Sequence, residues 1–289
     1  MTDALESLVT ELEKEPALLE PDQLRLRLDA LDRLDAYVPQ AACSTDPIEP
    51  KIYRRARAIC ARLEAANGEL YEAIRREIQR GSGPDALLLR WVPILAASGP
   101  ASGMGYDYLD ELVSGVLPFE EPGAEEIPRD AEQVFYQPTP ARHIFNLIGL
   151  TALTATDVLV DLGSGLGHVP LLVSICTPAR CIGIELEPAY VERARQCAQS
   201  LNLHLDRVSF LHQDARVADL SLGTVFYLYT PFTGSILRAV LDRLRREAAT
   251  RRIRICSYGP CTSVIAEEPW LEAATAVEAD RIALFRSRD

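Results

Sequence analysis

Three glycines at alternate positions follow an aspartate in the most informative stretch of the sequence. The residues are Asp161, which ends a short apolar run, and then Gly163, Gly165 and Gly167. Glycine accepts a positive φ and has no Cβ, so the backbone there can pass close to a ligand. Pro170 suits the first turn of a helix, and helix N-termini attract negatively charged groups. The pattern predicts a buried strand, a ligand-binding loop and a helix.

The spacing of the glycines separates two kinds of nucleotide cofactor. A dinucleotide-binding loop reads G-x-G-x-x-G, but here His168 stands where the last glycine would be. The order D-x-G-x-G-x-G resembles instead the first motif of class I S-adenosylmethionine-dependent methyltransferases. That resemblance implies an α/β fold with a Rossmann-like, doubly wound, mostly parallel seven-stranded sheet, and S-adenosylmethionine as cofactor. It assigns cofactor contacts in the loop to Asp161, Gly163, Ser164, Gly165 and Gly167.

Later apolar segments end in polar residues that suit the same cofactor. Residues 181–185 form a short predicted strand ending in Glu185, 22 residues beyond the first glycine of the loop. A carboxylate at that distance can accept hydrogen bonds from ribose hydroxyls at the carboxyl edge of the sheet. Another predicted strand, 207–213, precedes Asp214, which the resemblance places near the adenine amino group. Simpler interpretations stay open, because Glu185 also suits a solvated strand end and Asp214 a turn.

A segment before the predicted sheet also resembles this family. Tyr136 and Thr139 form a Tyr-x-x-Thr sequence, and the resemblance implies that both contact the cofactor in a segment folded over it. A structural role fits the same residues: Thr139 as the N-cap, and Pro140 as the first residue, of the helix that leads into the sheet. The sequence leaves both roles open.

The cofactor itself would carry the chemistry. Its sulfonium makes the methyl group electrophilic, so the protein has to orient a nucleophile in line with the S–CH₃ bond, without a metal or a covalent enzyme intermediate. The acceptor is expected just past the fourth predicted strand, residues 224–229. The candidate catalytic residues are therefore Tyr229, Thr230, Phe232 and, from the next strand, Tyr258, with Tyr229 also a cofactor contact.

The segment after the fourth strand bears on the substrate. It lacks the Asn/Asp-Pro-Pro-Tyr/Phe motif of enzymes that methylate planar nitrogens, and it has no carboxylates for a divalent metal. Tyr136, residues 161–167 and residues 229–232 resemble class I lysine methyltransferases that lack a SET domain. This resemblance implies a protein lysine as acceptor, with its alkyl-ammonium chain held by aromatic residues through cation–π attraction. Tyr229, Phe232 and Tyr258 would form that channel, although the same residues also suit a plain core.

Two other classes of function fit the sequence. A small-molecule methyltransferase would use the N-terminal helices as a lid over an apolar pocket. A sensor or scaffold would bind S-adenosylmethionine without transferring its methyl group, and its helices would form a homodimer surface.

Composition and charge predict how the chain is organised. Residues 1–117 carry apolar stripes at helical spacing and predict an all-α domain, 118–134 a linker, and 135–289 the methyltransferase domain. The net charge of −12 is uneven, since residues 1–130 carry 25 acidic against 14 basic side chains and the rest carry 17 against 16. Such acidity opposes direct binding of nucleic acid and suits a basic protein partner, although solvated helices explain it more simply.

The remaining features predict a cytoplasmic protein. No apolar run reaches the ~18 residues of a membrane helix, and the acidic N-terminus lacks the features of a secretion signal. The seven cysteines include no C-x-x-C pair, and the four histidines are scattered. We therefore expect free core thiols and no metal site.

Overall fold

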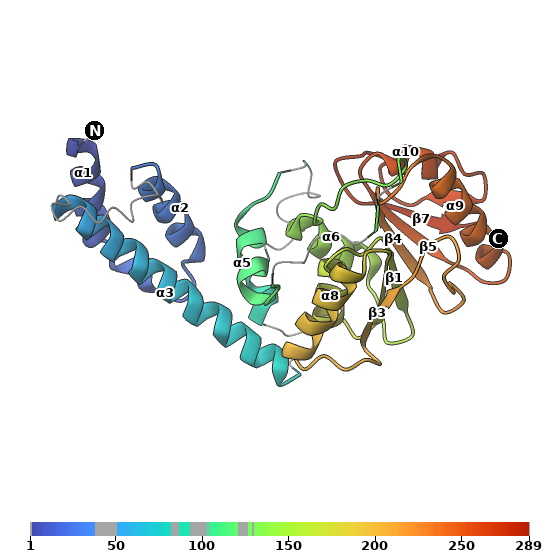
Figure 1. The fold of residues 1–289 in the computed structure, drawn as a ribbon, viewed down its shortest axis with the longest axis horizontal. Helices are drawn as coiled ribbons and strands as arrows, with labels where there is room; N and C mark the ends of the chain where they lie inside the picture. The colour runs from blue at the N-terminus through green and yellow to red at the C-terminus, as the bar shows by residue number, and fades with distance from the viewer. Residues whose placement is uncertain are drawn as a thin grey trace. The chain divides into compact units, whose positions relative to one another are not determined.

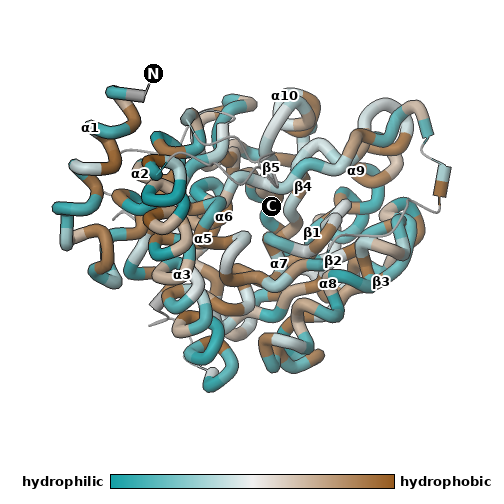
Figure 2. Tube along the Cα trace, turned by 60° about the vertical axis from the view of Figure 1, so that its left-hand side comes forward, coloured by the Kyte–Doolittle hydropathy of each residue, from teal (hydrophilic) through white to brown (hydrophobic). Residues whose placement is uncertain are grey.

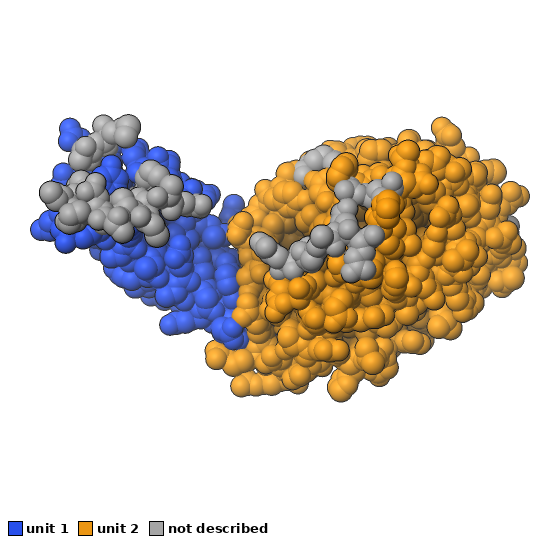
Figure 3. All heavy atoms as spheres, in the orientation of Figure 1, with its two compact units in different colours: residues 1–74 blue, residues 75–289 orange. Residues whose placement is uncertain are grey.

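The computed structural model describes residues 2–37, 51–81, 87–92, 103, 105–120, 127–128 and 130–288. The chain divides into two compact units, residues 1–74 and residues 75–289 (Figure 3). The boundary falls within α3 (Lys51–Gln79) and not in the predicted linker, 118–134. The predicted helical domain, 1–117, therefore extends past this division.

The first unit is made of helices that share one apolar cluster. They are α1 (Thr2–Glu13), the 3-10 helix η1 (Pro16–Leu19), α2 (Leu24–Asp35) and the part of α3 up to the boundary. Leu5, Val9, Leu34 and Ala56 are buried together in the cluster. Figure 2 shows hydrophobic and hydrophilic residues alternating along α1 and α3, as expected for helices with one apolar face.

The second unit is built on a seven-stranded sheet (Figure 1). Its strands are β1 (Val158–Leu162), β2 (Arg180–Glu185), β3 (Val208–His212), β4 (Val225–Tyr229), β5 (Arg254–Tyr258), β6 (Leu271–Ala273) and β7 (Ala283–Ser287). Their order in space is β3-β2-β1-β4-β5-β7-β6. Strands β1 to β5 are parallel, and β7 is antiparallel to both of its neighbours. The mostly parallel α/β sheet predicted from the sequence is confirmed.

Helices cover both faces of this sheet. The helices of the unit are η3 (Leu87–Trp91), α5 (Tyr108–Val116), α6 (Ala141–Thr151), α7 (His168–Cys176), α8 (Pro188–Ser200), α9 (Gly234–Ala248) and α10 (Cys261–Ala266). Leu241 of α9 and Ile265 of α10 share a buried cluster with Val160 and Phe226 of the strands. The opposite face packs against α7 and α8. Among the described residues, no helix has the length and apolar character needed to cross a membrane.

The start of α6 differs from the cap proposed from the sequence. Pro140 is the N-cap residue, and Thr139 makes no cap, because its Oγ1 lies 2.9 Å from the hydroxyl of Tyr227. A carboxylate of α5 takes over that function: Asp110 Oδ1 accepts a hydrogen bond from the Ala141 amide at 2.7 Å. This bond joins α5 to α6, and both helices belong to the second unit.

Candidate functional site

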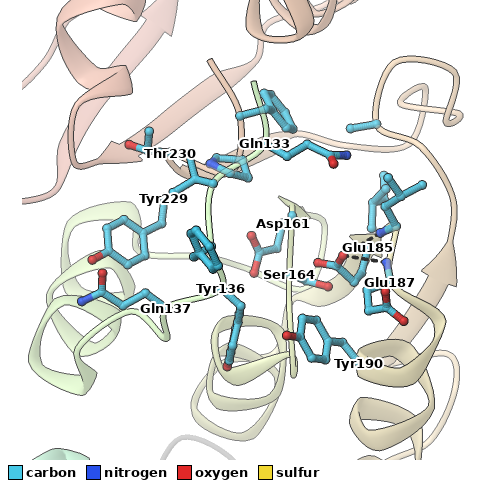
Figure 4. A pocket seen from close by; sticks show the side chains of 18 of the residues that line it. Gln133, Tyr136, Gln137, Asp161, Ser164, Glu185, Glu187, Tyr190, Tyr229 and Thr230 are labelled. Atoms are coloured by element: carbon cyan, nitrogen blue, oxygen red, sulfur yellow. Dashed lines mark hydrogen bonds between the residues drawn. The ribbon is translucent and has the colours of Figure 1, made fainter. Parts of the chain in front are cut away.

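A cavity of about 490 Å³ lies where the parallel strands end (Figure 4). Its walls come from the loops after β1, β2, β3 and β4 and from residues 133–139, which precede α6. Open α/β sheets bind their ligands at this edge. Most residues predicted for the site line the cavity, namely Tyr136, Thr139, Asp161, Gly163, Ser164, Glu185, Asp214, Tyr229, Thr230 and Phe232. Gly165, Gly167 and Tyr258 are predicted site residues that are not part of the lining.

The glycine loop needs its glycines mainly for the protein's own packing. Gly163, Gly165 and Gly167 have φ values of +89°, +51° and +84°, which strain any other residue. A Cβ added to them would overlap protein side chains, at 2.3 Å from Pro231, 2.0 Å from Tyr136 and 2.4 Å from Phe210. Gly163 faces the cavity, whereas the other two glycines are buried. Of the three glycines predicted to contact the cofactor, Gly163 therefore lines the cavity, and Gly165 and Gly167 do not.

Glu185 joins the glycine loop to the end of β2. One of its carboxylate oxygens accepts a hydrogen bond from Gly165 N at 2.8 Å. The other accepts from Leu186 N at 2.7 Å and from Glu187 N at 2.9 Å. Burial raises the pKa of Glu185, and these backbone donors oppose the rise. The oxygen that bonds Gly165 N keeps a lone pair for a further donor, in the place predicted for a ribose-binding carboxylate.

Asp161 and Ser164 bring polar side chains of buried residues to the cavity. Both residues are buried and line the cavity. Burial, and secondarily the nearby Glu185, raises the pKa of Asp161 well above its usual range. Within the described part of the chain, Ser164 Oγ has no hydrogen-bond partner. Buried polar groups are normally satisfied, so this pair indicates a ligand that carries hydrogen-bonding groups.

Asp214 is both a turn residue and part of the cavity wall. Its carboxylate accepts the Arg216 amide at 2.8 Å, as in the turn interpretation, and pairs with the Arg216 guanidinium at 2.6 Å. The hydrogen bond from this guanidinium lowers the pKa of Asp214. The carboxylate is therefore ionised and held in one orientation at the end of β3.

Residues 132–139, which we term the strap, cross the cavity beside the loop after β4. The amide of Val134 donates to the Pro231 carbonyl at 3.2 Å, and the amide of Thr233 donates to the Glu132 carbonyl at 2.8 Å. These bonds fix the strap against the loop on which the acceptor is expected. Because the strap also carries Tyr136 and Thr139, the Tyr-x-x-Thr sequence forms one wall of the cavity.

The loop after β4 is held in an uncommon backbone conformation. Thr230 has φ +35°, and its Oγ1 accepts the Cys261 amide at 3.1 Å and donates to the Tyr258 carbonyl at 3.3 Å. Residues with such φ values cluster at functional sites, where the surrounding structure holds them. Two hydrogen bonds from one hydroxyl provide that restraint here.

Only part of the predicted aromatic channel faces the cavity. Tyr229 and Phe232 line it, whereas Tyr258 is fully buried and donates to the Gly103 carbonyl at 3.1 Å. The Tyr258 ring lies against Tyr229 with ring centroids 4.6 Å apart. Tyr258 therefore supports Tyr229 from behind, and its predicted place in the channel is corrected. Burial raises the pKa of Tyr229 to about 12, so its hydroxyl stays protonated.

Several lining residues were not predicted from the sequence. Tyr227 pairs with Asp161 across β4 and β1 and so shares its face, which strand alternation would have indicated. The Glu187 carboxylate accepts a hydrogen bond from Ala189 N and so caps α8. In the sequence, such a residue predicts the start of a helix but not a place in a cavity wall. Ile127, from the predicted linker, donates its amide to Glu187. A proline-rich acidic sequence gives no signal for such a contact.

The cavity divides chemically into two sides. Figure 4 shows Asp161, Ser164 and Glu185 gathered on one side, with Tyr229 and Thr230 on the other. The first side offers acceptors for a polar ligand, and the second offers aromatic and uncharged walls. Across the described residues, no three His, Cys, Asp or Glu side chains are placed to hold a metal ion.

Comparisons with known proteins gave matches only among solved structures. No protein-family model and no curated protein match the sequence. Among solved structures, an RNA methyltransferase from Salinibacter ruber in complex with S-adenosyl-L-homocysteine is 26% identical over 52% of this chain and 92% of its own, with a TM-score of 0.42. A methyltransferase from Geobacter sulfurreducens is 16% identical over 53% and 80%, with a TM-score of 0.41. A human methyltransferase 10 domain containing protein is 13% identical over 59% and 88%, with a TM-score of 0.39.

We assign the fold from the strand order, because structural matches with TM-scores this low cannot support an assignment. The antiparallel β7 lies between β5 and β6 at one end of an otherwise parallel sheet. The fold is that of a class I methyltransferase. The expectation drawn from the glycine loop is thereby confirmed at the level of the fold.

We predict that Gly165→Val displaces Tyr136 from the cavity wall. The valine Cβ would overlap the Tyr136 ring, and the φ of +51° opposes a β-branched residue. Such strain costs on the order of 1–3 kcal/mol, which thermal unfolding would detect as a lower midpoint. Gly105→Val is the matched control, because a Cβ there meets nothing within 4 Å and the residue has no positive φ. A Gly165→Val protein as stable as the wild type would contradict the described packing.

Proposed function

We propose that this protein is an S-adenosylmethionine-dependent methyltransferase that transfers the methyl group by direct in-line displacement. The observation that carries the proposal is the buried Asp161 carboxyl, with its raised pKa, and the unpartnered Ser164 hydroxyl beside the ribose-type carboxylate Glu185. All three lie at the edge of a class I methyltransferase sheet. The cavity of about 490 Å³ is also within the range of small-molecule sites.

The residues present fit the cofactor. Asp161 and Ser164 would hold the amino-acid end, since an ammonium group supplies the charge and the donors that a buried carboxylate needs. Glu185 would accept the ribose hydroxyls at its open lone pair. Asp214, oriented by Arg216, would serve the adenine amino group.

When bound, the cofactor supplies an electrophilic methyl group, and the chain orients the acceptor toward it. Tyr229, Thr230 and Phe232 face the cavity from the loop after β4. The strap closes over this loop through hydrogen bonds between Val134 and Pro231 and between Thr233 and Glu132. Such closure excludes water and fixes the acceptor position, which lowers the barrier without a covalent intermediate.

We propose a protein lysine as the methyl acceptor, with a small molecule as the alternative. Tyr229 and Phe232 give aromatic walls to the acceptor side, and Phe135 of the strap is 76% exposed while lining the cavity. Aromatic faces suit the alkyl-ammonium chain of lysine. The acidic residues of the N-terminal part favour a basic protein partner. The Salinibacter ruber neighbour is an RNA methyltransferase, but its acceptor does not identify the acceptor of the present protein.

Calorimetry followed by label transfer tests the proposal. S-adenosylmethionine and S-adenosylhomocysteine should bind the purified protein, and NAD should not. The purified protein and methyl-labelled cofactor are then incubated with a cell lysate, and the mixture is separated into protein, RNA and small-molecule fractions. Label in the protein fraction supports a lysine acceptor. Label in the RNA or the small-molecule fraction would replace lysine with that class of acceptor. Binding without transfer would indicate the sensor, and absence of binding would overturn the proposal.

We predict that Asp161→Asn stabilises the ligand-free protein and weakens cofactor binding. Because the pKa of Asp161 is raised on folding, its stabilising protonated form is lost as pH rises through the folded pKa. Asparagine does not ionise. The free energy of unfolding of the variant, measured in denaturant titrations, should therefore exceed that of the wild type by an amount that grows with pH. S-adenosylhomocysteine should bind roughly tenfold or more weakly, because its ammonium loses a charged partner. A variant that is less stable at high pH, or that binds equally well, would contradict this role.

Glu185→Gln should weaken S-adenosylhomocysteine binding by roughly 1–3 kcal/mol. The carboxamide nitrogen cannot accept the hydrogen bonds that a carboxylate oxygen takes from Gly165, Leu186 or Glu187. Calorimetry measures the change, with Glu192→Gln on the surface of α8 as the control. If Glu185→Gln binds like the wild type, the ribose assignment is withdrawn.

A further inference from the structure

The first residues of the predicted linker reach the glycine loop through a histidine. The ring of Phe119 lies against the ring of His168, the first residue of α7, with centroids 4.5 Å apart. From its other side His168 meets the strap, since its Nδ1 is 3.1 Å from the Tyr136 hydroxyl. His168 and Tyr136 both line the cavity. Neither Phe119 nor His168 was predicted to take part in the site.

Tyr136 occupies the space that the loop leaves open. A Cβ on Gly165 would lie 2.0 Å from Tyr136 Cε2, so the ring covers this glycine directly. On its other flank the ring meets Tyr190 of α8, with centroids 5.1 Å apart. The position of the Tyr136 ring therefore sets the shape of the cavity above the glycine loop.

His168 is suited to accept a hydrogen bond from Tyr136 through one ring nitrogen. Burial lowers its pKa to about 4, so the imidazole is neutral at physiological pH. Burial raises the pKa of Tyr136, so its hydroxyl keeps its proton and donates it. Both groups are neutral, and we assign the donor role to Tyr136 Oη and the acceptor role to His168 Nδ1, because a phenol is a stronger acid than a neutral imidazole; the imidazole proton is then on Nε2.

We infer that His168 is a positioning residue for the cofactor, which holds the Tyr136 ring over the glycine loop and is itself set by Phe119. The inference rests on the proposed function, because the cofactor is what the wall would fit. It also gives a role to the start of the predicted linker, whose Phe119 backs the histidine. An arrangement of this kind selects one tyrosine orientation before ligand binds, so less ordering remains at the binding step.

The test measures the affinity of S-adenosylhomocysteine for matched variants. His168→Leu replaces the imidazole with an apolar side chain and so removes the acceptor, and Tyr136→Phe removes the donor. Each should weaken binding by about threefold to tenfold. The double variant should lose no more than the larger single loss, because both changes break the same bond. His168→Asn should recover most of the affinity, since its Oδ1 can take the place of Nδ1.

Two controls separate this inference from the proposed function and from folding. His204→Leu makes the same substitution at an exposed residue outside the cavity and should leave affinity unchanged. Unfolding midpoints are measured for every variant; if His168→Leu does not fold, Tyr136→Phe and His168→Asn carry the test. Wild-type protein that fails to bind would overturn the proposed function. Wild-type binding with unchanged affinity in Tyr136→Phe, or with no recovery in His168→Asn, would overturn the positioning role alone.

Discussion

The hydrogen bonds of the Glu185 carboxylate are the constraint on which the site depends. One buried acid takes the amides of Gly165, Leu186 and Glu187, and so fixes the loop after β1 against the loop after β2. The same carboxylate faces the cavity, so the group that organises the apo site is also one that a ligand would meet. Structure and binding share a single side chain.

Asp161 shows the opposite arrangement. It is buried near another acid, and in the described structure no hydrogen bond offsets the rise of its pKa. A well-packed fold would not retain such a group for stability, because an unpaired buried carboxylate is costly. Its retention at the end of β1 agrees with a site in which the ligand, rather than the protein, supplies the partner.

The third element of the site is the chain that precedes the sheet. The strap pairs with the loop after β4, and Phe119 and Ile127 contact His168 and Glu187 from the region predicted to be a linker. Segments far apart in sequence therefore complete one cavity. The helix α5, which is bonded to α6, belongs to this same unit, and the division of the chain falls within α3.

The sequence by itself determined the fold class and ten of the thirty residues that line the cavity, because strand, loop and helix signals are local and the carboxyl ends of parallel strands must meet at one edge. Asp161, Ser164 and Glu185 were found this way. The tertiary structure alone decided that the glycines accommodate Pro231, Tyr136 and Phe210, that Tyr258 lies behind Tyr229, and that His168 bonds Tyr136. These contacts join residues separated by tens of positions, and only packing in three dimensions determines which side chains fill the space that a glycine leaves.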